Sequence, residues 1–230
     1  MVDADPQCNA TQYLLGKDAR KTHFDLAEFF EQFLAFRARP RDPRDFVCPT
    51  PYDNLELMMA SPALADLQSR LEAKHKIYKL RDALEELSRT FDAVYIDTPA
   101  SLSFYTLSGL IAAQACLIPF DCDEFSRRAV YGLLESVDEI RADHNRQLRI
   151  EGIVVNQFRA RANQPQRVVA ALKEDGQRVC STMLSSSVKM SESHGQAVPL
   201  IHFAPSHKLT RQYIDLFNEL QPQRTEKSPA

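Results

Sequence analysis

Apolar and polar residues follow two periods along the chain, and together they predict helices interleaved with short strands. Apolar residues recur at every third or fourth position, as in amphipathic helices, in 24–36, 62–87, 102–113, 126–142, 164–175 and 206–220. Short continuous apolar runs, typical of buried parallel strands, occupy 46–49, 91–97, 115–120, 152–157 and, more weakly, 179–184. This alternation predicts an α/β fold, a parallel sheet flanked by helices.

The length and the two ends of the chain predict its domain organisation. The 230 residues contain no internal repeat and no linker-like stretch, so we expect one domain over residues 1–220 and a disordered tail over 221–230. Apart from the initial Met1, only Val2 precedes the acidic segment that begins at Asp3. A buried parallel strand needs about four to eight apolar residues. We therefore expect a domain that is incomplete at its N-terminus.

Composition excludes several classes of protein. The net charge of −3 gives no overall basic field. The five cysteines are scattered without a C-x-x-C pair, so neither a zinc site nor a disulfide framework is indicated. No apolar run reaches the roughly 18 residues of a membrane span and no signal peptide opens the sequence, so we expect a cytoplasmic protein. The six glycines are never clustered, and a G-x-x-x-x-G-K-[ST] phosphate loop is absent from this sequence.

Candidate chemistry lies where three predicted strands end. Asp3 and Asp5 follow the first, Asp97 ends the strand over 91–97, and Asn156 ends the strand over 152–157. The carboxyl ends of parallel strands share one edge of a sheet, where ligands bind. An acid there can hold magnesium through water, a second acid can orient an attacking water, and an amide can recognise a base edge.

Each of these residues also has a plainer interpretation. Asp97 with Thr98 could cap the following helix, Asp5 with Pro6 could form an ordinary turn, and Asn156 could be a loop former. The three features in this order are more specific than any one of them.

Several segments resemble the ParA-type partitioning ATPases, the class with a deviant Walker A motif that also includes MinD. Residues 3–11 (DADPQCNAT) resemble the segment after the second strand of that family, and residues 91–103 (FDAVYIDTPASLS) resemble its Walker B strand and loop. Further similar segments are 53–57 with Ser61, 187–195 (SVKMSESHG) and 199–201. The resemblance covers roughly residues 2–220 and implies a P-loop NTPase-like parallel sheet.

The resemblance also implies roles for individual residues. Asp5 would position the hydrolytic water, Asp3 would support the metal site, and Asp97, followed by Thr98, would be the Walker B acid that holds Mg²⁺ through water. Asn156 would lie near the adenine. The implied cofactors are ATP and Mg²⁺, and the implied partners are a second copy in a homodimer, nonspecific DNA and a ParB-like or other stimulating adaptor. Such proteins position chromosomes, plasmids or other cargo on the nucleoid.

The sequence departs from the family pattern at its start. The family places K-G-G-x-G-K-[ST] on a first strand–loop–helix unit, and no stretch of these 230 residues supplies it. The resemblance implies an ATPase, but without those phosphate contacts we expect these 230 residues to bind ATP weakly or not at all and not to hydrolyse it. A misplaced start or a degenerate paralogue would both account for the departure. The alternative function is a non-catalytic DNA-tethering or interaction scaffold, and an amide-forming cobyrinate synthase relative is a further enzyme alternative.

Cations in the C-terminal half are candidates for DNA contact. Nonspecific binding needs little more than a patch of Lys and Arg facing the phosphates. The candidates are Arg159, Arg167, Lys189, Lys208 and Arg211. For each of them, an ordinary solvated surface position is the competing interpretation.

Overall fold

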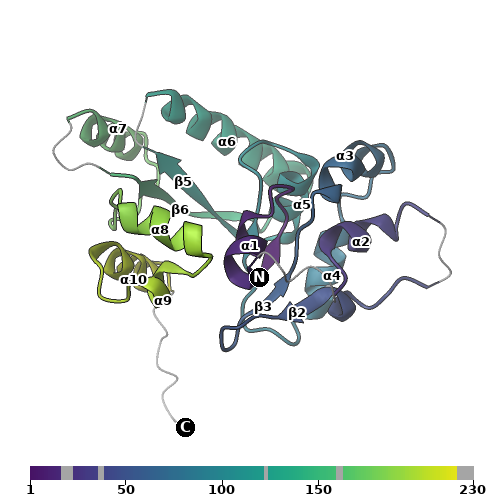
Figure 1. Cartoon of the computed structure of the whole chain (residues 1–230). Coiled ribbons are helices and arrows are strands. Elements are labelled where there is room, and N and C mark those ends of the chain that lie inside the picture. Colours follow the sequence, from purple (N-terminus) through teal and green to yellow (C-terminus); the bar gives the residue numbers. More distant parts are fainter. Residues whose placement is uncertain (17–22, 36–38, 122–123, 159–162, 222–230) are drawn as a thin grey trace, which may run out of the picture. The chain divides into compact units, whose positions relative to one another are not determined.

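The computed structural model describes residues 1–16, 23–35, 39–121, 124–158 and 163–221. It divides the chain into two compact units: unit 1 comprises Met1–Gln114 with Glu139–Leu148, and unit 2 comprises Ala115–Asp138 with Arg149–Ala230. Each unit holds its own sheet and its own helices (Figure 1). The predicted α/β class is confirmed. The single domain over 1–220 stays a prediction, and almost all of the predicted tail lies outside the described residues.

Unit 1 is built on a four-stranded sheet in the order β2-β3-β1-β4. The strands are β1 Val2–Asp3, β2 Val47–Pro49, β3 Glu56–Met58 and β4 Ile96–Asp97. β1 runs parallel to both neighbours, with Asp3 opposite Asp97. β2 is antiparallel to β3 because a tight turn joins them, in which the Thr50 amide donates to the Leu55 carbonyl. The sheet is therefore mixed rather than wholly parallel.

The helices of unit 1 begin and end with different local signals. They are α1 Asn9–Leu15, α2 Leu26–Glu31, α3 Ala63–Ala73, α4 Lys79–Leu87 and α5 Phe104–Ala112. A capping box formed by Asp25 and Glu28 begins α2. This helix ends earlier than the predicted 24–36, because the amides of Phe33 and Leu34 bond three residues back in a tighter turn. The predicted helix over 62–87 breaks near His75, whose φ is +52°.

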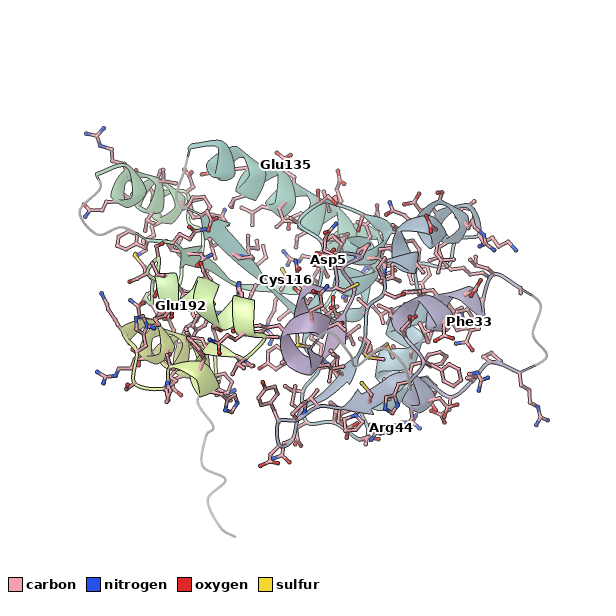
Figure 2. The ribbon with its side chains drawn as sticks, viewed as in Figure 1. Asp5, Phe33, Arg44, Cys116, Glu135 and Glu192 are labelled. Carbon is pink, nitrogen blue, oxygen red and sulfur yellow. The ribbon has the colours of Figure 1, made fainter. Side chains whose placement is uncertain are left out.

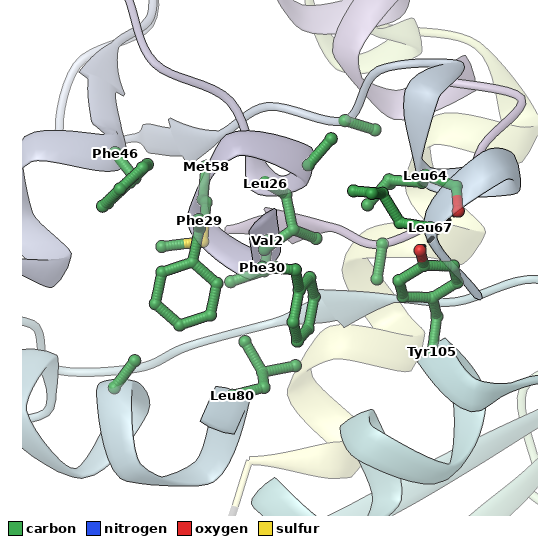
Figure 3. Packing of buried hydrophobic residues seen from close by; sticks show 14 of the residues in the cluster. Val2, Leu26, Phe29, Phe30, Phe46, Met58, Leu64, Leu67, Leu80 and Tyr105 are labelled. Carbon is green, nitrogen blue, oxygen red and sulfur yellow. Dashed lines mark hydrogen bonds between the residues drawn. The ribbon is translucent and has the colours of Figure 1, made fainter. Parts of the chain in front are cut away.

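Aromatic packing fills the core of unit 1 between the sheet and its helices (Figure 3). Phe29 and Phe30 of α2 are almost fully buried, and Phe30 meets both Phe104 and Tyr105 of α5 edge to face. Such contacts add about 0.5–1.5 kcal/mol each beyond the area that they bury. The phenylalanines of α2 are thus core residues that pack this helix against α5.

Unit 2 contains a separate parallel pair, β5 Ala115–Asp121 and β6 Arg149–Asn156, with Asp121 opposite Asn156. Its helices are most of α6 Glu124–Asp143, then α7 Asn163–Glu174, α8 Val188–Gln196, α9 Leu200–Phe203 and α10 Lys208–Leu220. Within the described ranges no strand joins β4 to β5, so the prediction of one sheet carrying all the strand ends is wrong for this structure.

The weak strand predicted over 179–184 forms only an isolated bridge, between Ile153 and Val179. Side chains of α10 take up several of the amides that a longer strand would use. Glu219 accepts from the amides of Ser181 and Thr182 at 2.6 and 2.9 Å. These hydrogen bonds to α10 hold the segment in a loop conformation. Figure 1 shows α9 and α10, the last two helices of unit 2.

Candidate functional site

Three carboxyl groups meet at the ends of two neighbouring strands in unit 1. The parallel register sets Asp3 of β1 directly opposite Asp97 of β4, and the amide of Ala4 donates to the Asp97 carbonyl at 2.8 Å. Asp5 follows on the same strand end, at the start of the turn that leads into α1 (Figure 2). The structure thus brings together the three acids that the sequence singled out.

Asp3 is completely buried and its carboxylate is fully engaged by protein donors. One oxygen accepts from the amide and the hydroxyl of Thr11, both at 2.7 Å, and the other accepts from the Asp5 amide at 3.1 Å. The Thr11 hydroxyl accepts in turn from the Ala60 amide at 3.0 Å. Burial raises the pKa of Asp3, and these hydrogen bonds oppose that shift. Asp3 therefore ties β1 to α1 and to the end of β3, rather than pointing freely at a ligand.

Asp5 is held less tightly than Asp3. One oxygen accepts from the Gln7 amide at 2.9 Å, which forms a local turn, and its carbonyl accepts from the Cys8 amide. Cys8 then adopts a left-handed φ of +57° at the start of α1. The second carboxylate oxygen of Asp5 has no recorded protein donor among the described residues, so it can face a water or a cation.

Asp97 carries the largest electrostatic perturbation among the three acids. Burial, followed by repulsion from Asp3 and Asp5, raises its pKa from 3.8 to about 6, and a hydrogen bond from the Thr98 amide partly opposes the shift. No ion pair is recorded for any of the three acids in the described parts of the chain. Negative charge here is therefore uncompensated, and a cation would relieve it.

The loop after Asp97 is anchored to α5. The Thr106 hydroxyl contacts the carbonyls of Ser101 and Pro99 at 2.6 and 3.2 Å. Gly109 lies so close to this strand end that an added Cβ would be 3.0 Å from Cγ2 of Thr98. The sequence showed neither contact, because both depend on how α5 packs against the loop.

The carboxylates fit a hydrated divalent cation better than a directly bound metal. Among the described residues, no group of three or more His, Cys, Asp or Glu side chains is placed to hold a metal ion by itself. Both oxygens of Asp3 are already bonded, which leaves Asp5 and Asp97 to face water. This agrees with magnesium held through water and completed by ligands from elsewhere.

Unit 2 holds the predicted base-reading residue. Asn156 ends β6 and is partly buried. The next residue, Gln157, has a left-handed φ of +49°, and its side-chain amide donates to Asp121 at 3.0 Å. The Gln157–Asp121 hydrogen bond thus holds the ends of β5 and β6 together, and Asn156 is the last residue of β6 beside it. This hydrogen bond was not predicted, because nothing in the sequence pairs Asp121 with Gln157.

The predicted DNA-facing cations differ in whether an acidic side chain pairs with them. Lys189 of α8 pairs with Glu192 at 2.6 Å and lies over the Phe203 ring. Arg167, Lys208 and Arg211 are exposed, and no ion pair is recorded for them within the described residues. Arg159 lies outside the described residues. The free charges are therefore on α7 and on the first turn of α10.

A sheet with polar residues at the carboxyl ends of its parallel strands, next to the start of a helix, is typical of α/β proteins that bind ligands at that edge. A family model described as an AAA domain (AAA_31) matches residues 1–150, and the chain belongs to this family, in its ParA/MinD branch. The resemblance read from the sequence is thus confirmed. No helix in the described ranges is long and apolar enough to span a membrane.

Individual relatives agree with this assignment. The chromosome partitioning protein ParA of Myxococcus xanthus is 30% identical over 231 residues, which cover 100% of this chain and 79% of the relative. The structure of apo McdA from Cyanothece has a TM-score of 0.82 at 22% identity, over 96% of this chain and 86% of that one. Cobyrinic acid a,c-diamide synthase from Mycobacterium smegmatis with bound ADP and magnesium has a TM-score of 0.71 at 25% identity, over 85% and 78%.

Proposed function

We propose that this protein is a partitioning or cargo-positioning factor of the ParA type. In this proposal the intact family dimerises with ATP, binds DNA nonspecifically on the nucleoid and responds to a ParB-like or other adaptor, and these 230 residues are impaired in ATP binding and hydrolysis. The observation that supports the proposal most is the meeting of Asp3, Asp5 and Asp97 at adjoining strand ends. The similarity to a chromosome partitioning ParA over the whole chain supports the same conclusion.

The proposed roles follow from how each side chain is held. Asp5, with one oxygen free of protein donors, orients the attacking water. Asp97 with Thr98 faces a hydrated Mg²⁺, and Asp3 holds Asp5 in place through its amide. Asn156 reads the adenine from the end of β6. When bound, Mg²⁺ would neutralise the negative charge of these acids and of the nucleotide phosphates.

The 230-residue chain should bind ATP weakly by itself. The cobyrinic acid synthase neighbour was solved with ADP and magnesium, whereas these 230 residues contain no glycine-rich phosphate loop. Loops of that kind supply the backbone donors that surround phosphates. The acids of unit 1 attract the cation, but they repel the phosphates when the cation is absent.

Calorimetric titration of the 230-residue chain with Mg-ATP tests this part of the proposal. We expect no saturable binding tighter than about 1 mM, which corresponds to about −4 kcal/mol. Asp97→Asn serves as the comparison variant. Because the unchanged chain is expected to bind Mg-ATP so weakly, the substitution should change the heats of Mg-ATP injection little. Micromolar binding that Asp97→Asn weakens would contradict the proposed impairment and would establish the site as complete in this chain.

DNA retention tests the nucleoid part of the proposal, and the chain offers a matched control. We expect Lys208→Gln with Arg211→Gln to weaken retention of a nonspecific duplex, and retention to fall steeply between 50 and 200 mM salt. Arg149→Gln removes a cation that is already paired with Glu151 at 2.9 Å, so it should have little effect. Equal losses in both variants, or retention independent of salt, would count against this interface.

The alternative is a non-catalytic scaffold of the same family that tethers partners to DNA. The exposed side chains of Arg167, Lys208 and Arg211 would serve such tethering equally well. The two proposals separate in one comparison: a scaffold retains DNA equally with and without Mg-ATP, whereas a ParA-type switch requires the nucleotide.

A further inference from the structure

Unit 1 contains a cavity of about 440 Å³, and none of the three strand-end acids lines it. Its walls come from α2 and the turn after it, from the loop residues 40–43, and from α4. Binding sites for small molecules typically have volumes of about 300–1,000 Å³. Every lining residue belongs to unit 1, so this α2–α4 cavity is defined without reference to unit 2.

The apolar part of the wall is mainly aromatic. Phe29 is 1% exposed and packs edge to face against Phe33, with the ring centroids 5.3 Å apart. Ala83 of α4 is also buried and contributes only a methyl group to the wall. Aromatic rings attract apolar groups through their area and cations through their faces. The wall therefore suits a ligand that has an apolar body.

The loop that forms the second wall is held by hydrogen bonds. Gln32 follows α2 and is buried, and its side-chain oxygen accepts from the Arg41 amide at 2.8 Å. The Asp42 carboxylate accepts from the Arg44 amide at 2.7 Å and caps the short 3₁₀ helix η2 Pro43–Phe46. A wall that is already ordered loses less conformational entropy when a ligand binds.

The charges in the wall determine which ligand fits. Two cations and three acids line the cavity. Lys79 and Asp82 pair at 3.0 Å, and the Arg41 guanidinium lies over a phenylalanine ring that is not part of the wall. For the other two acids, Asp42 and Glu86, no ion pair is recorded among the described residues. The wall thus carries unbalanced negative charge, which a cationic group would relieve.

We propose that the α2–α4 cavity binds a free small organic amine with an aromatic body, of the arylalkylamine class. Its ammonium group lies beside Asp42 and Glu86, and its ring packs against Phe29 and Phe33. The size of the cavity and its walls from three elements favour a small molecule over a protein segment. The site uses neither the strand-end acids nor the cations of α7 and α10, so it can succeed or fail independently of the ATP and DNA functions proposed above.

The test uses the 230-residue chain and phenethylamine, followed by saturation-transfer NMR without nucleotide. We expect saturable binding with a Kd of about 1 mM or tighter. Phenethyl alcohol has the same ring without the charge, and phenylacetate has the opposite charge. Each should bind at least about threefold more weakly. Ethylamine keeps the charge but has no ring, so it should bind at least about tenfold more weakly.

Variants of the protein locate the ammonium group. Glu86→Gln removes an unpaired acid of the wall and should weaken phenethylamine binding at least about threefold. Asp42→Asn keeps a side-chain oxygen for the cap of η2 and should weaken binding by a similar factor. Glu85→Gln is the matched control, because Glu85 is the adjacent exposed acid of α4 and does not line the cavity. It should bind like the unchanged chain, and thermal unfolding of all three variants checks the fold.

Several results would overturn the proposal. No saturable binding of phenethylamine would remove the site. Equal affinity for phenethyl alcohol, or undiminished binding by Glu86→Gln, would remove the role of the acids. Tighter binding of phenylacetate would show that the cavity selects anions. Equal losses in Glu85→Gln and Glu86→Gln would place the ammonium group outside the cavity.

Discussion

Replacing Asp97 by asparagine removes a charge that the folded protein holds unfavourably. Its pKa is about 6 in the folded chain against 3.8 normally, and each pKa unit corresponds to about 1.4 kcal/mol. The upper bound is therefore about 3 kcal/mol. The side chain is only partly buried and solvent screens the repulsion, so we expect Asp97→Asn to raise the free energy of unfolding by about 1–2 kcal/mol at pH 8.

The pH dependence of this gain gives the sharper test. A carboxyl with a raised folded pKa costs nothing below pH 3.8, where it is protonated in both states. Its cost develops as pH rises toward 6 and is complete above it. Urea unfolding should therefore show about half of the gain at pH 5. Asp92→Asn, at an exposed position, is the control. A gain independent of pH, or a loss of stability at pH 8, would refute the reasoning.

Two further substitutions probe the packing around these acids. Thr11→Val leaves a buried Asp3 oxygen and the Ala60 amide without their hydroxyl partner, so it should lower the free energy of unfolding in denaturant by about 2–3 kcal/mol. Thr11→Ser keeps the hydroxyl and should lose much less stability. Equal losses in the two variants would contradict the role of the hydroxyl. Gly109→Ala places a Cβ 3.0 Å from Thr98 Cγ2 and should cost about 1–3 kcal/mol. Thr98→Ser removes that methyl, so the double variant should regain stability; strictly additive losses would show that the contact is not the cause.

The strand-end acids could be predicted from the sequence because the rule behind them is general. A short apolar run that ends in a polar residue indicates a buried strand, and parallel strands share one edge. That rule correctly brought Asp97 next to Asp3. The same rule predicted that Asn156 would end a strand of the sheet that contains Asp3. In the described residues Asn156 instead ends β6, which pairs only with β5 among the named strands. The hydrophobic period of a segment predicts that it is a strand, but it does not predict which strand lies next to it.

Element lengths were less predictable, because partners decide them. The apolar run over 91–97 forms a strand only at Ile96–Asp97, since its neighbour β1 is itself two residues long. In the run over 179–184, the amides of Cys180 and Leu184 donate to β6, but those of Ser181 and Thr182 donate to Glu219 of α10. Helix α1 follows a cysteine in a left-handed conformation with no side-chain cap, so no start signal marks it. In each case tertiary contacts overrode a local preference.

Carbon-detected NMR titration of the Asp97 carboxyl group tests the central claim most directly, because it reports whether three acids meet at these strand ends. We predict a pKa of about 6 in the unchanged chain and a lower value in Asp5→Asn, where one repelling charge is gone. An ordinary value near 3.8 that Asp5→Asn leaves unmoved would contradict the account.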